Sequence, residues 1–154
     1  MTDGSAANLQ DAASRRVFEF LEPDEIDELF EYLQNRECPA GTVLIHEGEA
    51  SSYTGFLVQG RLAVKKRTEF FGKYIIVAIF EAGAIVGEGA MAEQMDRSTI
   101  VIVLEDSRLL TLSLEKMNLL CSRNPGLATK LYRRFLLVSH LRLQKAGERL
   151  SQLL

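Results

Sequence analysis

The chain has 154 residues, a formal net charge of −3 and 47% hydrophobic residues, which is the composition of one ordinary folded domain. The slightly negative charge argues against a general nucleic-acid binder. No run approaches the ~18 apolar residues that a membrane span needs, and residues 1–13 lack a signal-peptide pattern. We expect a cytoplasmic protein with a flexible tail at residues 1–13 and one domain at residues 14–154.

The first expected elements are two short helices. Val17, Phe20 and Leu21 repeat at helical spacing. Pro23 then opens a second helix, because proline suits a first turn and the acidic residues after it match the helix dipole. This helix places four apolar side chains on one face: Ile26, Leu29, Phe30 and Leu33.

Short apolar runs separated by glycine turns follow, which is typical of a β-sandwich or barrel. Gln59–Gly60–Arg61 and Phe71–Gly72–Lys73 have the composition of hairpin connections. We expect a barrel over about residues 40–113, with these strands: Thr42–Ile45, Gly55–Val58, Arg61–Lys65, Tyr74–Phe80, Ile85–Val86, Ser98–Val103 and Arg108–Leu112.

Residues 114–154 return to a helical period. A short helix, Leu114–Cys121, precedes Asn124–Pro125–Gly126, and a long helix then runs to about Leu154. One apolar face carries Leu131, Phe135, Val138 and Leu141, and a second face carries Leu136, Leu143 and Leu150. Two apolar faces indicate either a homodimer formed through this helix or one broad face packed on the core.

The segment from Gly87 to Thr99 carries the most specific chemistry in the sequence. Gly87, Gly89 and Ala90 let backbone N–H groups approach a ligand, and a helical turn at Glu88 would present an anion site. Arg97 supplies a planar fork of donors that suits phosphate oxygens. Hydroxyls follow at Ser98 and Thr99. Because a bound phosphate would repel the Glu88 carboxylate, Glu88 needs a ligand hydroxyl or Arg97 as its partner.

This segment resembles the phosphate-binding cassette of the cyclic-nucleotide-binding domains. The matching residues are Gly87–Glu88–Gly89–Ala90 and Arg97–Ser98–Thr99. The resemblance extends from about Phe20 to Leu154. It includes the barrel opening at Pro39–Ile45, Gly60, and Pro125 before the last helix.

The resemblance implies a mainly β fold with flanking helices: a double-stranded β-helix (jelly roll) with N-terminal helices and a long C-terminal helix. It implies that Glu88 holds the ribose 2′-hydroxyl and Arg97 the cyclic phosphate, with backbone N–H groups of Gly89, Ala90 and Ser98 around it. Val77, Ala78 and Phe80 would wall the base. The last helix would cover the base near Arg142 and Leu143.

Two positions depart from the family pattern. Ile85–Val86 replaces an aromatic residue before Gly87–Glu88, and Gly89 replaces a Leu or Ile that anchors the cassette to the core. A glycine there costs roughly 1 kcal/mol of helix propensity. We therefore expect a loosely packed cassette.

The sequence gives less support to other kinds of site. Cys38 and Cys121 lie in no CxxC or Cys/His cluster, so we expect no zinc and a structural role for both. His46 and His140 stand on distant segments, which argues against the metal site of a cupin-like barrel. No nucleophile–base pair or Walker loop is present, so we expect no enzyme activity and no cofactor.

The sequence thus predicts a non-catalytic regulatory domain that binds cAMP or cGMP and transmits binding through its last helix. A degenerate cassette serving only as an interaction or dimerisation module is the main alternative, and a different small anion on Arg97 is a third. No DNA-binding domain and no membrane span can be read in these residues.

Overall fold

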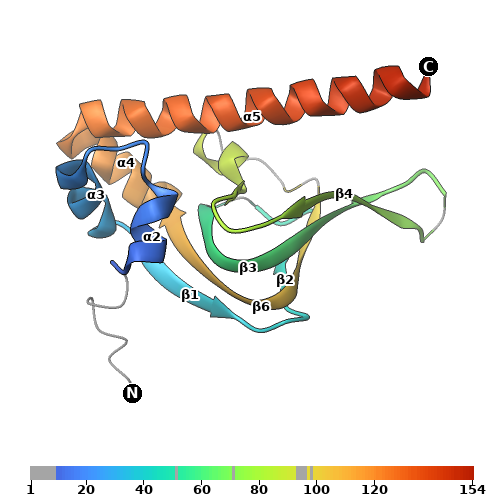
Figure 1. Ribbon diagram of the computed structural model, residues 1–154, viewed down its shortest axis with the longest axis horizontal. Helices are drawn as coiled ribbons and strands as arrows, with labels where there is room; N and C mark the ends of the chain where they lie inside the picture. The colour runs from blue at the N-terminus through green and yellow to red at the C-terminus, as the bar shows by residue number, and fades with distance from the viewer. Residues whose placement is uncertain (1–9, 51, 71, 93–96, 98) are drawn as a thin grey trace.

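The computed structural model describes residues 10–50, 52–70, 72–92, 97 and 99–154. A β-roll carries short helices at one end, and a long helix runs across its top (Figure 1). The helices are α2 (Ala12–Val17), α3 (Pro23–Phe30), the 3₁₀ helix η1 (Glu88–Met91), α4 (Leu114–Arg123) and α5 (Pro125–Leu153). The strands are β1 (Gln34–Cys38), β2 (Val43–Ile45), β3 (Tyr53–Arg67), β4 (Tyr74–Phe80), β5 (Ile85–Val86) and β6 (Ile100–Ser113).

The strands are antiparallel in the order β1–β6–β3–β4, while β2 also pairs with β6 and β5 with β3. This arrangement confirms the jelly-roll fold with flanking helices. Two long strands, β3 and β6, form its centre, and four shorter ones complete the two sides. Among the described residues, no helix is both long and apolar enough to cross a bilayer.

Gly60 does not form the predicted hairpin. It lies inside the continuous strand β3, at an irregularity in the pairing with β6. Its φ is 112°, and a Cβ at this position would lie 2.0 Å from the Ser107 Oγ. The glycine therefore bends a single strand where it crosses β6 closely, and the two predicted strands on either side of it are one. Arg108–Leu112 likewise belongs to the same strand as Ile100–Val103.

The start of the roll also differs from the prediction. Residues 34–38 pair with β6 as β1, ahead of the barrel boundary expected near residue 40. Their side chains are exposed except for Cys38, so the hydrophobic pattern gave no signal. At the N-terminus, Ala12 and Ala13 lie in α2, which Asp11 caps by accepting a hydrogen bond from the Ser14 N–H. Residues 1–9 lie outside the described part.

Two apolar clusters fill the molecule. One joins α2–α5 to one side of the roll, around Phe18, Phe56 and Leu131. The other lies inside the roll, around Leu62, Val101 and Leu109. Cys38 belongs to the second cluster and is a free thiol, and Cys121 packs at the edge of the first. β3 contributes to both clusters, so the helical end and the roll are built on one strand.

Candidate functional site

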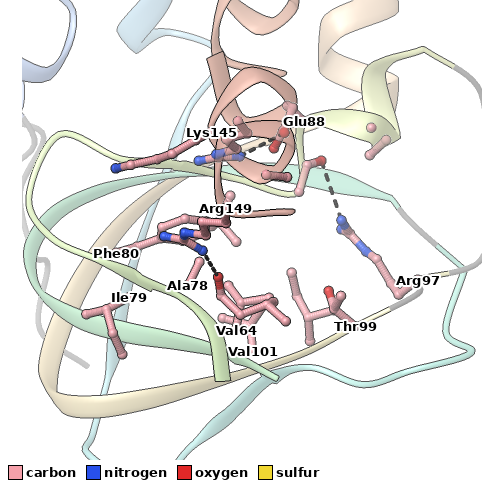
Figure 2. A pocket seen from close by; sticks show the side chains of 18 residues that line it. Val64, Ala78, Ile79, Phe80, Glu88, Arg97, Thr99, Val101, Lys145 and Arg149 are labelled. Atoms are coloured by element: carbon pink, nitrogen blue, oxygen red, sulfur yellow. Dashed lines mark hydrogen bonds and ion pairs between the residues drawn. The ribbon is translucent and has the colours of Figure 1, made fainter. Parts of the chain in front are cut away.

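A cavity of about 670 Å³ lies between the open side of the roll and α5 (Figure 2). The volume falls within the range of small-ligand pockets. Apolar side chains of β2, β3, β4 and β6 form its walls, the segment from Val86 to Ala90 forms one end, and α5 lies across it. Its lining comprises Ile45, Val64, Val77, Ala78, Ile79, Phe80, Val86, Gly87, Glu88, Gly89, Ala90, Arg97, Thr99, Val101, Arg142, Lys145, Ala146 and Arg149.

Gly87 makes room for Arg97. The φ of Gly87 is 75°, in the left-handed region that glycine tolerates best. A Cβ on Gly87 would lie 2.4 Å from the Arg97 Nη1, which is shorter than any real contact. The glycine thus serves both the turn into η1 and the close approach of the guanidinium.

Arg97 is held at both its backbone and its side chain. Its N–H donates to the Glu49 carbonyl (2.7 Å) and its carbonyl accepts from the Gly48 N–H (2.8 Å). The side chain donates through Nη2 to the Tyr53 carbonyl (2.8 Å) and through Nη1 to the Gly87 carbonyl (3.4 Å). The guanidinium also lies 5.4 Å from the centre of the Tyr53 ring. These contacts fix where its charge is presented to the cavity.

The charge of Arg97 has no ion-pair partner in the part of the chain that the structure describes. Burial lowers the pKa of its guanidinium from the ordinary value, and the nearby Tyr53, Glu88 and Glu49 oppose that shift. The group still stays protonated at physiological pH. A half-buried cation whose described contacts are neutral carbonyls and an aromatic ring favours an anion beside it.

Glu88 is paired with α5 rather than with Arg97. Its Oε1 accepts from the Arg142 Nη1 at 2.8 Å and from the Ser139 hydroxyl at 3.3 Å. The Arg142 guanidinium also donates to the Ile85 carbonyl and lies 4.4 Å from the centre of the Phe80 ring. The carboxylate predicted to hold a ligand hydroxyl therefore already ties the cavity to the last helix.

The described start of the cassette is anchored by the residues on either side of Gly89. A Cβ on Gly89 would meet nothing within 4 Å, so the position faces open space rather than the core. Ala90 and Met91 are buried instead, at 0% and 3% exposure. Ile85 and Val86, which replace the family's aromatic residue, are buried as well. Residues 93–96 and 98 of the cassette lie outside the described residues, so the looseness of the whole cassette stays a prediction.

The cavity collects every described residue expected in the cassette and the base wall, and Arg142. Leu143, expected beside Arg142 over the base, does not line the cavity and is 72% exposed. Ser98 lies outside the described residues. Sequence reasoning missed several apolar residues that line the cavity, because alternating apolar and polar side chains are expected in any strand of the roll. These residues are Ile45, Val64, Ile79, Val86 and Val101. Sequence reasoning also missed Lys145 and Arg149, although their spacing from Arg142 places them on one face of α5. Among the described residues, no group of three or more His, Cys, Asp or Glu side chains is arranged to hold a metal.

An antiparallel roll with a cationic pocket under a terminal helix defines a small-ligand-binding module. A model of the cyclic nucleotide-binding domain matches residues 35–124, more than half of the chain. The chain belongs to the cyclic nucleotide-binding domain family.

Individual relatives agree with this assignment. The cyclic AMP receptor protein of Thermus thermophilus is 28% identical over 115 residues, which are 75% of this chain and 53% of the relative. A putative potassium channel protein of Rhodopseudomonas palustris is 27% identical over 115 residues, which are 75% of this chain and 27% of the relative. The chain thus spans about half of one curated relative and about a quarter of the other.

Solved structures show the same fold. A cyclic nucleotide-binding domain from Methylobacillus flagellatus has a TM-score of 0.82 at 25% identity, covering 87% of this chain and 75% of that one. The catabolite activator protein of Thermus thermophilus has a TM-score of 0.73 at 26% identity, covering 89% of this chain and 62% of that one.

Proposed function

We propose that this domain is a non-catalytic sensor that binds a cyclic nucleotide such as cAMP or cGMP in the cavity beneath α5. The observation that carries the proposal is Arg97, a partly buried cation with no ion pair to any described residue, presented to a cavity whose opposite wall is apolar. The cyclic phosphate would bind Arg97 and the N–H groups at the start of η1, and the base would pack on Val77 and Phe80.

Binding would reach the rest of the molecule through Glu88. Arg142 and Ser139 both donate to the Oε1 of Glu88, so a ribose hydroxyl that donates to this oxygen competes with them. A ligand that changes this contact shifts the balance between two positions of α5, in proportion to its different affinity for each. The output of the sensor is then a change in what the last helix presents.

Thermal unfolding tests the proposal. We expect cAMP or cGMP, at ~100 times its Kd, to stabilise the protein by about 2.7 kcal/mol, or roughly 5–10 °C for a domain of this size. The shift should vanish in Arg97→Ala. Arg133→Ala is the matched control, because it removes one exposed arginine of α5 that does not line the cavity. No shift with either nucleotide, or an equal shift in Arg97→Ala, contradicts the proposal.

A second candidate function is self-association through α5. Leu136, Leu143 and Leu150 recur every seven residues and are 71%, 72% and 60% exposed, a spacing typical of a helix–helix seam. We expect a concentration-dependent dimer in light scattering that Leu143→Gln weakens. A dimer that no nucleotide affects, together with an absence of nucleotide binding, would favour this function over sensing.

A further inference from the structure

Three cationic residues form a row on the cavity side of α5. Arg142, Lys145 and Arg149 are spaced by three and four residues, so their side chains lie on one face of the helix. All three line the cavity. Like charges at this spacing repel one another, so the row destabilises the helix unless negative charge lies beside it.

Among the described residues, an ion pair compensates only the first of these charges. Arg142 forms the ion pair with Glu88. Arg149 donates to a neutral group, the Val77 carbonyl, at 3.0 Å. Lys145 makes no hydrogen bond or ion pair with any residue that the structure describes. Lys145 and Arg149 therefore present two uncompensated charges to the cavity.

A cation outside the cavity behaves differently. Lys130, nearer the start of α5, bonds the Glu25 carboxylate at 2.7 Å. Arg134 lies 4.9 Å from the centre of the Phe20 ring, so its charge also meets a partner within the protein. Lys130 and Arg134 thus each meet a partner within the protein, whereas Arg149 meets a neutral carbonyl and Lys145 meets no partner among the described residues.

The row is also separated from Arg97. In Figure 2, Lys145 and Arg97 lie on opposite sides of the cavity, and the apolar side chains of Val64, Ala78 and Val101 form the wall below them. One phosphate bound at Arg97 would leave Lys145 and Arg149 without an anion. A ligand that satisfies both ends needs two anionic groups with a flat or apolar part between them.

We propose that Lys145 and Arg149 form a second anion subsite, so that the cavity prefers a cyclic nucleotide carrying a second, separated phosphate. This inference rests on the proposed function, which places the first phosphate at Arg97. A cyclic dinucleotide has the required chemistry, because two phosphodiesters lie on opposite sides of one ring with bases beside them. Arg149 keeps further donors free after its bond to Val77, and Lys145 keeps all three.

Calorimetric titration of the full chain tests the inference with four probes: cAMP, cyclic di-GMP, cyclic di-AMP and guanosine tetraphosphate. We expect a cyclic dinucleotide to bind more tightly than cAMP. Replacing both cations, Lys145→Gln with Arg149→Gln, should weaken dinucleotide binding about tenfold or more and change cAMP binding less than twofold. Tighter binding of the tetraphosphate would identify a linear polyphosphate nucleotide as the ligand and overturn the cyclic assignment.

Matched variants separate charge from folding. Arg133→Gln removes one exposed charge from α5 outside the cavity and should leave every affinity unchanged. Lys145→Arg keeps the charge and should retain dinucleotide binding. The double variant removes the repulsion between two exposed cations and also the Arg149 bond to the Val77 carbonyl, so without ligand it should melt close to the wild type.

The outcomes distinguish this inference from the proposed function. An equal loss of cAMP and dinucleotide affinity in the double variant would mean that α5 contacts the base and would overturn the second subsite. Unchanged dinucleotide affinity would overturn it as well. In both cases, loss of cAMP binding in Arg97→Ala would leave the proposed function standing. If Arg97→Ala binds all four probes like the wild type, the proposed function fails first.

Discussion

The two halves of α5 are held to the rest of the molecule by different forces. In the first half, residues 125–138, Leu127, Leu131 and Phe135 are buried at 1%, 0% and 4% exposure in the cluster shared with the other helices. In the second half, residues 139–153, no described side chain is buried. Apolar burial therefore fixes the beginning of the helix, and it does not fix the end.

Polar contacts hold the second half over the cavity. They run from Ser139 and Arg142 to Glu88, from Arg142 to the Ile85 carbonyl, and from Arg149 to the Val77 carbonyl. Such bonds exchange readily with water or with ligand groups, because their net free energy is small. Leu141, expected on the core face, is 52% exposed. The end of the helix is thus suited to move while its beginning remains in the core.

The largest expected effect is on global stability, in the first half. Leu131→Ala removes a fully buried side chain and should lower the free energy of unfolding by about 2–5 kcal/mol. Leu143→Ala, at 72% exposure in the second half, should change it by less than about 0.5 kcal/mol. Chemical denaturation measures both. Similar losses in the two variants would show that the halves are held alike.

A smaller effect is expected at the polar contact with the cassette. Arg142→Gln removes the ion pair with Glu88, and because the arginine side chain is 33% exposed, we expect a loss of about 0.5–1 kcal/mol. Amide exchange should accelerate about fivefold in residues 139–153 and stay unchanged in residues 125–138. Arg133→Gln is the control. Faster amide exchange along the whole of α5 would contradict the division of the helix into two differently held halves.

The first half also carries one polar contact, and its contribution depends on pH. The hydrogen bond from Lys130, together with one from the Glu22 N–H, lowers the pKa of Glu25 from its ordinary value of 4.5. A lowered folded-state pKa stabilises the protein above about pH 4.5, and this stability is lost as pH falls through the lowered value. Lys130→Gln should therefore cost about 0.2–1 kcal/mol at pH 7.

The same variant supplies its own check on the pH dependence. Below the folded pKa of Glu25 the carboxyl is protonated, so Lys130→Gln and wild type should be nearly equal in stability there. A difference that persists undiminished in acid would mean that Lys130 acts through packing rather than through its charge.

The smallest global effect is expected for Gly147→Ala in the second half. Glycine in a helix interior costs about 1 kcal/mol relative to alanine, and a Cβ here meets nothing within 4 Å. If the end of α5 opens separately, the gain should slow amide exchange in residues 139–153 and leave the global unfolding midpoint nearly unchanged. If the free energy of global unfolding instead rises by the full difference of about 1 kcal/mol between glycine and alanine, the end of α5 unfolds only together with the core.

Local chemistry explains how much of the site the sequence could predict. Gly87 and Arg97 stand ten residues apart and contact each other. The positive φ of Gly87 and the close approach of the Arg97 guanidinium both favour glycine at position 87. The pairing of Glu88 with Arg142 joins residues 54 positions apart. Nothing local in either segment specifies that partner, so only the packing of α5 on the roll reveals it.

The same distinction holds for the fold. Helices α3 and α5 follow from their apolar periods, and Pro23 occupies the first turn of α3 as expected. α5 begins at Pro125, two residues before the expected start at Leu127. β1 was not predicted because its side chains are mostly polar and exposed. Its strand conformation comes from backbone pairing with β6, which the hydrophobic pattern of residues 34–38 does not encode.

The pairing of β1 with β6 has a consequence for how the chain folds. Gln34 and Thr111 lie side by side although 77 positions separate them. Closing so long a loop costs chain entropy before the contacts it permits can form. We therefore expect slow folding in one cooperative step, and a nascent chain that stays open until β6 has been synthesised. A fragment that ends before residue 100 should have neither the roll nor the cavity.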